Sequence, residues 1–351
     1  MIVMYINDIF NIKSYSKPDT PRYKFIKELA LGGMGKVSLI EDNDLNRNVV
    51  MKTLRTDLKT ERIMKQFLQE AKIIGSLEHP NIIPIYDFGI HENSMFYTMK
   101  FVKGKTLKQI VDILKSNKNA HNLYTWNLRV HIVQQVCEAL EYAHSKNVIH
   151  LDLKPENIMV GEFGEVMVMD WGISKIIENA YNIDKNKSKS DERITGSPPY
   201  MAPEQITDPG VVDFRADLYA LGSLLYELLS LQRAHAGSEV EEIFSSVVHE
   251  RPKSLMSIKN DVQGAIPAEL HYITSDLMKK DPAQRQDSAN HLKEDLQKFI
   301  DGKYPCKCPH TTAKRVAMAF TRLIDGYFNE MVMGIVLVII SLLLLLLFSP
   351  S

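Results

Sequence analysis

The residues that could do chemistry gather in two short segments in the middle of the chain. Residues 150–157 (HLDLKPEN) contain Asp152, which can accept a hydroxyl proton, and Lys154, which can neutralise a phosphoryl group during its transfer. Asp170 follows Asn157 after thirteen residues, and an Asn/Asp pair supplies the hard oxygen ligands that bind magnesium. Each of these residues alone is an ordinary polar residue of a loop. Together, in this order, they predict phosphoryl transfer.

A glycine-rich segment near the N-terminus could bind phosphate through its backbone. Residues 31–37 (LGGMGKV) place three glycines between two runs of alternating polarity. Glycines at this spacing let backbone amides approach phosphate oxygens, because no Cβ is in the way. An ordinary glycine-rich hairpin is the alternative. The segment lacks the GK[ST] ending and precedes an expected strand, so neither a P-loop nor a dinucleotide fingerprint is predicted.

A lysine and a glutamate further along the chain favour the same chemistry. Lys52 ends an apolar strand-like run, where a lysine is ordinarily a charge at a strand edge. Residues 61–77 predict an amphipathic helix whose apolar stripe is formed by Ile63, Phe67, Ile74 and Leu77. Glu70 lies on the same stripe. An unpaired carboxylate on a buried face is costly, so Lys52 is its expected partner.

The elements that must position these residues follow two patterns. Residues 22–54 alternate between polar and apolar and predict strands, whereas helical periodicity dominates from residue 125 onward. Within residues 125–145 one helix face carries Ile132, Val136, Leu140 and Ala143. Residues 176–193 are polar and aperiodic and predict a loop. The expected fold is α+β, with a small β-rich lobe followed by a larger helical lobe.

The composition excludes several classes of protein. The 351 residues carry a net charge of −1, so nothing global calls for a nucleic-acid partner. The 17 glycines and 15 prolines are too few for a fibrous or low-complexity chain. The three cysteines are too few for a disulfide framework. Cys306 and Cys308 are expected to be reduced or acylated thiols rather than half of a zinc site.

An uncharged stretch near the C-terminus predicts a membrane-spanning helix. Residues 331–348 contain no charged side chain and would extend about 27 Å as a helix, close to the thickness of the bilayer core. A buried core helix is the alternative. Residues 301–330 form the expected juxtamembrane linker, whose lysines and arginines keep the preceding domain cytoplasmic. Residues 1–20 lack the pattern of a signal peptide, so a single-pass anchor at the C-terminus is expected.

Taken in order, the glycine-rich segment, Lys52, residues 150–157 and Asp170 resemble the eukaryotic-type serine/threonine protein kinases found in bacteria. The resemblance covers residues 23–300 and leaves residues 1–22 as an N-terminal extension. It implies the bilobal protein-kinase fold, with an N-lobe over about residues 23–102 and a C-lobe over about residues 103–300. It also implies ATP as the phosphoryl donor, Mg²⁺ or in its place Mn²⁺ as the metal, and proteins as substrates.

The resemblance assigns roles to individual residues. Asp152 would be the catalytic base and Lys154 would contact the γ-phosphate, while Asn157 and Asp170 would hold the metal ions. The ATP-binding residues would be Leu29, Ala30, Gly32, Gly33, Gly35, Val37, Lys52, Glu70, the gatekeeper Met99 and the hinge residues Phe101 and Val102. The activation segment would contain Ser188, Ser190, Thr195, Ser197 and Glu204. The structural residues would be His150, Trp171, Asp217, which steadies the catalytic loop, and Arg285, which pairs with Glu204.

The sequence departs from the family pattern at three positions. Ala30 replaces the first glycine of the loop, which a negative φ would tolerate. Trp171 replaces the phenylalanine that follows the metal-binding aspartate, so a large aromatic side chain is kept. Leu151 replaces the arginine before Asp152, which in the family binds a phosphorylated activation loop. Without that arginine, phosphorylation of the loop is not expected to be obligatory for activity.

Three functions are compatible with this pattern. The first is a membrane-tethered serine/threonine protein kinase that also phosphorylates itself. The second is a kinase-fold scaffold without activity, which only Leu151 and Ala30 favour. The third is a small-molecule kinase, against which the residues that build a protein-substrate platform, Glu204 and Arg285, argue. Gly334 and Ser341 would share one helix face, which offers a weak surface for a homodimer.

Overall fold

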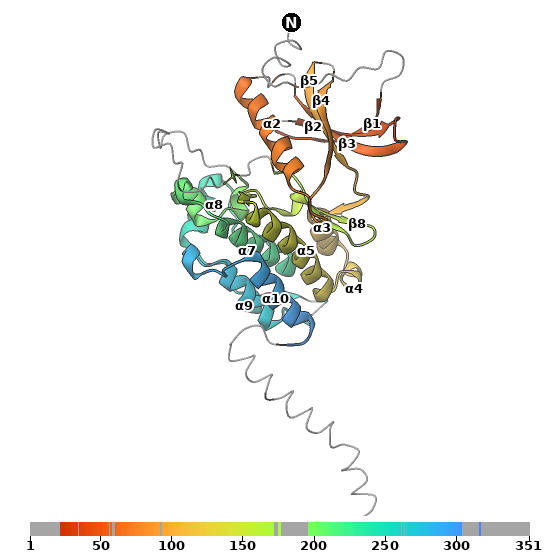
Figure 1. Ribbon diagram of the computed structural model, residues 1–351. Helices are drawn as coiled ribbons and strands as arrows, with labels where there is room; N and C mark the ends of the chain where they lie inside the picture. Colours follow the sequence, from red (N-terminus) through yellow and green to blue (C-terminus); the bar gives the residue numbers. More distant parts are fainter. Residues whose placement is uncertain are drawn as a thin grey trace, which may run out of the picture.

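The computed structural model describes residues 22–303, apart from 34, 56, 58–59, 92, 172–174, 177–195, 261 and 263, together with residue 316. Two lobes are visible in Figure 1, a small one dominated by strands and a larger helical one below it. This arrangement agrees with the predicted α+β fold. Within the described part of the chain, no helix is long and apolar enough to cross a membrane. The predicted span at residues 331–348 and the thiols of Cys306 and Cys308 lie outside the described residues.

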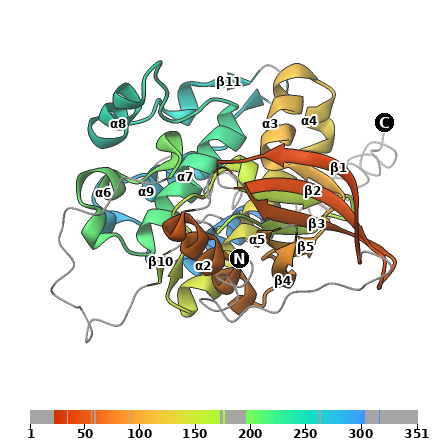
Figure 2. The same cartoon turned by 90° about the horizontal axis from the view of Figure 1, so that it is seen from above.

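The N-lobe is an antiparallel five-stranded sheet with one helix packed against it. The strand order is β1-β2-β3-β5-β4, and Figure 2 shows α2 beside the sheet. Alternate residues of β3 point to opposite sides of the sheet, and each side carries a cluster of buried apolar side chains. The elements are β1 (Tyr23–Leu31), β2 (Gly35–Asp42), β3 (Arg47–Leu54), α2 (Glu61–Ser76), β4 (Ile85–His91) and β5 (Ser94–Lys100).

Helix α2 is the element predicted at residues 61–77. Thr60 caps its N-terminus by accepting a hydrogen bond from the Ile63 amide. Phe67 and Glu70 are buried as predicted, Ile63 is half-buried and packs against the same core, and Met64 is buried beside it. The predicted stripe is therefore confirmed, with Met64 added to it at the first turn.

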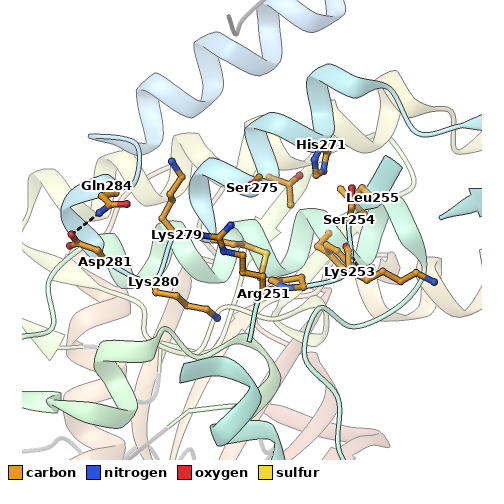
Figure 3. A pocket seen from close by; sticks show the side chains of 14 residues that line it. Arg251, Lys253, Ser254, Leu255, His271, Ser275, Lys279, Lys280, Asp281 and Gln284 are labelled. Carbon is orange, nitrogen blue, oxygen red and sulfur yellow. Dashed lines mark hydrogen bonds between the residues drawn. The ribbon is translucent and has the colours of Figure 1, made fainter. Parts of the chain in front are cut away.

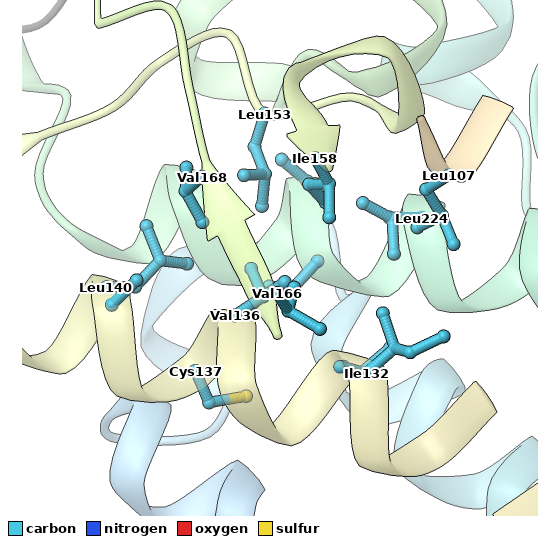
Figure 4. Close-up of a cluster of buried hydrophobic side chains, with 14 of the residues drawn as sticks. Leu107, Ile132, Val136, Cys137, Leu140, Leu153, Ile158, Val166, Val168 and Leu224 are labelled. Atoms are coloured by element: carbon cyan, nitrogen blue, oxygen red, sulfur yellow. The ribbon is translucent and has the colours of Figure 1, made fainter. Parts of the chain in front are cut away.

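The C-lobe is built around helices α5 and α7. Every residue of α7 after Arg215 is buried, which explains its lack of a polar face. The predicted face of α5 is buried, and Figure 4 shows it packed against β9 with Cys137 inside the core. The helices are α3 (Leu107–Ser116), α4 (Ala120–Leu123), α5 (Trp126–Ser145), α6 (Pro203–Thr207), α7 (Arg215–Ser230), α8 (Val240–His249), α9 (Ala268–Leu277) and α10 (Ala289–Ile300).

Short strands complete the C-lobe. They are β6 (Gly104–Thr106), β7 (Val148–Ile149), β8 (Ile158–Gly161), β9 (Val166–Val168), β10 (Lys175–Ile176), β11 (Lys259–Asn260) and β12 (Gly264–Ala265). The Val168 amide donates to the Asn81 carbonyl at 2.8 Å, and the Ile83 amide donates to the Val168 carbonyl at 3.1 Å. These backbone bonds tie β9 to the segment between α2 and β4, just before Asp170.

Candidate active site

Lys52 lies between two carboxylates at the junction of the lobes. Its Nζ donates to Glu70 Oε1 at 2.6 Å and to Asp170 Oδ1 at 3.1 Å. The predicted pairing of Lys52 with Glu70 is therefore present. Tyr97 on β5 also donates to Glu70 Oε1, at 2.6 Å. The three contacts fix the Lys52 side chain between β3, α2 and the segment after β9.

The charges around Lys52 shift its pKa and that of Asp170. Burial lowers the pKa of Lys52, but the nearby Glu70 and Asp170 carboxylates raise it by more, so the ammonium is kept. Burial raises the pKa of Asp170, and the Lys52 ammonium outweighs this, leaving the pKa below its usual value. Both groups are therefore charged at neutral pH, as phosphate and metal binding require.

A dense hydrogen-bond network holds the Asp152 carboxylate. Lys154 Nζ donates to Asp152 Oδ2 at 2.7 Å, and the Ser197 hydroxyl donates to Oδ1 at 2.7 Å. Lys154 Nζ also donates to Ser197 Oγ at 2.9 Å, which closes a triangle of side chains. Asn157 Nδ2 donates to the Asp152 carbonyl at 2.8 Å. The structure thus brings together the predicted base, the predicted phosphate-binding lysine and one predicted metal ligand.

Asp217 supports this loop from below. Its carboxylate accepts the amides of His150 and Leu151, both at 2.9 Å, and is bonded to His144 Nε2 at 2.8 Å. Burial raises the pKa of Asp217, but the hydrogen bonds from His144 and from the His150 amide help to lower it overall. These bonds hold Leu151 at a φ of +64°, a conformation that is strained for a side chain of its size. The Leu151 side chain itself packs against the apolar core.

His150 and Trp171 form the rear wall of the site. The Asp152 amide donates to His150 Nδ1 at 3.2 Å, so Nε2 carries the proton and is the donor to the Met169 carbonyl at 3.1 Å. The His150 ring lies 4.6 Å from the Trp171 ring, centroid to centroid, and both side chains are fully buried. Both ring nitrogens of His150 are therefore held by backbone groups, and its ring packs against Trp171, as expected of a structural residue.

Glu204 and Arg285 form a buried ion pair below the activation segment. Arg285 donates through both terminal nitrogens to the two Glu204 oxygens, at 2.5 and 2.7 Å. The same guanidinium donates to the carbonyls of Arg215, Lys279 and Lys280. A planar guanidinium can satisfy this many acceptors at once, which a lysine could not. The predicted pair is thus present and also joins α6, α7 and the turn after α9.

The predicted nucleotide-binding residues lie along β1, β2, β3 and the segment after β5. Ala30 pairs with Val37 across the β1–β2 hairpin, and the Gly32 amide donates to the Gly35 carbonyl at 2.8 Å. A Cβ at Gly35 would lie 3.2 Å from Thr53 O and from Lys52 Cγ, so any other residue would force these neighbours to shift by a few tenths of an ångström. Leu29, Gly33, Met99, Phe101 and Val102 are described as well, with Met99 at the end of β5.

Some predicted residues are not brought to the site, and others were missed. Ser188, Ser190 and Thr195 lie outside the described residues. Tyr97 and His144 were not predicted, although they bind Glu70 and Asp217. The signal for Tyr97 was its place on an apolar strand, where a phenol needs a buried partner. The sequence carries no comparable signal for His144, which follows an ordinary helix pattern.

Comparison with known proteins agrees with this geometry. The family model "Protein kinase domain" matches residues 23–296. The serine/threonine-protein kinase PknD of Protochlamydia amoebophila is 33% identical over 306 residues, which cover 82% of this chain and 30% of the relative. PknD of Chlamydia trachomatis serovar D is 31% identical over 336 residues, which cover 89% of this chain and 35% of the relative. This chain therefore spans about a third of the length of these curated relatives. Because the family model matches most of the sequence and the predicted side chains meet in one site, the chain belongs to the protein kinase family.

Proposed function

We propose that this chain transfers the γ-phosphoryl group of ATP to serine or threonine hydroxyls of proteins, itself included. The observation that carries this proposal is the triangle of Asp152, Lys154 and Ser197. Asp152 would accept the proton of the attacking hydroxyl, and Lys154, 2.7 Å from it, would neutralise the charge that develops on the transferred group. The relatives are named as serine/threonine-protein kinases, which supports serine and threonine rather than tyrosine as the residues phosphorylated.

ATP and a divalent metal are general requirements of the family, and the described residues fit both. The Asn157 amide nitrogen is bonded to Asp152, so the amide oxygen is the atom left for a cation. The Asp170 side chain is 47% exposed and supplies carboxylate oxygen. Such ligands suit Mg²⁺, with Mn²⁺ as the alternative, and the ion would neutralise phosphate charge. Phe101 and Val102 make no backbone hydrogen bond to another described residue, so their amides and carbonyls can meet the adenine edge.

A protein substrate fits better than a small molecule. Glu204 and Arg285 hold α6 against α7 and thereby order the chain that follows Ser197, where a peptide would lie. A catalytically inactive scaffold remains the second candidate because of Leu151 and Ala30. The sequence nevertheless keeps Lys52, Asp152, Lys154, Asn157 and Asp170, which favours the enzyme.

The proposal includes a membrane tether. Its support is the uncharged stretch 331–348, and the tether would place the kinase domain on the cytoplasmic side with its activity confined to the membrane surface. A homodimer through the face of Gly334 and Ser341 is the weaker extension of this idea.

The test of the activity uses the full chain with labelled ATP, Mg²⁺ and a generic protein substrate, beside Asp152→Asn as control. We expect phosphate on serine or threonine of the substrate and of the chain, lost in the control. Nucleotide binding without phosphate transfer in the folded wild type would identify the scaffold instead. Transfer to aminoglycosides or choline but not to proteins would identify the small-molecule kinase.

A further inference from the structure

A cavity of about 650 Å³ opens in the C-lobe, and none of the predicted site residues lines it. The segment that follows α8, helix α9 and the turn after α9 surround it (Figure 3). Its floor is apolar, with Leu255 fully buried and Met278 nearly so. A cavity of this size holds a side chain of a partner together with part of its backbone.

The rim of this cavity is strongly basic. Four cations line it, from Arg251 and Lys253 on one side to Lys279 and Lys280 on the other, and His271 lies beside them. Asp281 is the one carboxylate among the described lining residues. It already accepts hydrogen bonds from the Ala283 amide at 2.9 Å and from Gln284 Nε2 at 3.2 Å. The cavity therefore has a positive potential that its own acid does not cancel.

The cations of the rim differ in how many hydrogen bonds and ion pairs they already make with the protein. Lys280 donates to the Val247 carbonyl and to Tyr219, and burial together with the Arg285 charge lowers its pKa to about 8. Lys279 lies 3.3 Å from Asp276 in an exposed pair, which is weak. Arg251 has neither an ion pair nor a hydrogen bond with any described residue. In Figure 3 its guanidinium lies toward the space below Ser275.

We propose that this cavity binds a phosphate monoester, carried as phosphothreonine or phosphoserine on a peptide. A guanidinium without partners can grip two phosphate oxygens at once, and the lysines beside it match the second negative charge. The exposed Ser275 hydroxyl is a further donor, and the apolar floor suits the carbon atoms of a modified side chain. This inference rests on the proposed function, since a protein kinase produces such groups.

The position of the cavity couples it to the substrate platform. Arg285, which grips Glu204, donates to the Lys279 carbonyl at 2.8 Å and to the Lys280 carbonyl at 3.1 Å. The backbone that carries two of the cavity's cations is thus held by the same arginine that binds Glu204. A phosphopeptide bound here would be held on the C-lobe, so that another serine or threonine of the same peptide could reach the active site.

The test measures binding, without ATP, of a fluorescent peptide that contains phosphothreonine and of its unphosphorylated twin to the full chain. Because no nucleotide is present, the outcome does not depend on catalytic activity, and an Asp152→Asn chain should bind equally well. We expect the phosphorylated peptide to bind at least roughly tenfold more tightly than its twin. Arg251→Gln should abolish that preference. Lys118→Gln, which removes an exposed cation of the same lobe outside the cavity, should leave it intact.

Two results would overturn the inference. One is equal affinity for the two peptides, and the other is an equal loss of binding in Lys118→Gln and Arg251→Gln, which would mean non-specific attraction. Free inorganic phosphate is added as a competitor. Competition only at concentrations far above those of the peptide supports a peptide ligand, whereas equal affinity for free phosphate would refute the peptide as its source.

Discussion

Among the described residues, Lys52 is the cation that pairs with the buried Glu70 carboxylate. Lys52→Met leaves that carboxylate with Tyr97 as its only described partner. We expect phosphoryl transfer to fall by about 100-fold and the free energy of unfolding by about 3 kcal/mol. Adding Glu70→Gln removes the buried charge and should restore most of the stability but none of the activity. Urea unfolding and transfer rates of both variants test this, and a double variant no more stable than the single one contradicts it.

Ser197 joins the catalytic carboxylate to Lys154 through one hydroxyl. Ser197→Ala removes a donor to Asp152 and an acceptor for Lys154, so we expect kcat to fall roughly tenfold. The KM for ATP should change less than kcat, because these contacts involve neither Lys52 nor the hinge residues, although Lys154 is expected to contact the γ-phosphate. Ser197→Thr keeps the hydroxyl and is the matched control. Steady-state kinetics that show wild-type turnover in Ser197→Ala would rule out this positioning role.

At the scale of elements, phosphorylation of the activation segment should matter little, because Leu151 replaces the arginine that would bind its phosphate. Leu151 offers no cation to a phosphate, and its carbonyl instead accepts a hydrogen bond from Gln205 at 3.2 Å, which attaches α6 to the catalytic loop. A chain with Ser188, Ser190 and Thr195 all replaced by alanine should therefore keep most of its activity. Transfer to an added substrate is the measurement. A folded but inactive triple variant would mean that loop phosphorylation is required after all.

Helices α7 and α8 are joined by a directed chain of hydrogen bonds. Lys280 donates to Tyr219, Tyr219 to His235, His235 to Ser246, and Ser246 to Glu250. The Glu250 carboxylate only accepts, so the Ser246 hydroxyl donates to it and accepts from His235 Nδ1. Burial lowers the pKa of His235, so the ring is neutral at pH 7 and its Nε2 accepts from Tyr219.

The buried His235 gives this helix pair a dependence on pH. Burial and the Lys280 charge lower its pKa from 6.5 to about 4, so the stabilisation is complete above pH 6.5 and is lost as the pH falls toward 4. The whole effect amounts to about 3 kcal/mol. In His235→Gln, the free energy of unfolding should fall less steeply over this pH window. Urea titrations at several pH values measure it, and parallel curves for variant and wild type would refute the assignment.

For the whole molecule, the proposed tether predicts where the chain is found in a cell. The full chain should sediment with membranes, resist extraction by high salt and dissolve in detergent. Replacing Leu344 and Leu345 by arginine places two charges in the C-terminal half of the stretch, each costing up to about 3 kcal/mol of insertion. We expect that variant in the supernatant. Leu344→Ile with Leu345→Ile is the matched control, and a wild-type chain released by salt alone would contradict the tether.

The sequence by itself determined the two lobes, the order of the catalytic residues and the pairing of Lys52 with Glu70. These follow from local rules, since periodicity defines the faces of helices and strands and a buried acid demands a cation. Val136 and Leu140 were likewise predicted on the apolar face of a helix, and both are fully buried.

The tertiary structure alone decided which distant side chains complete the site. Tyr97 reaches Glu70 across 27 positions, and His144 reaches Asp217 across 73, by packing that no local pattern encodes. Along α2, only the packing against the sheet decides that Met64 is buried while Ile63 is half-buried. The basic cavity likewise exists only because the segment with Arg251 and the turn with Lys280 fold beside each other. The sequence shows which chemical groups the chain carries and in what order. The distances between those groups depend on the packing of the whole core.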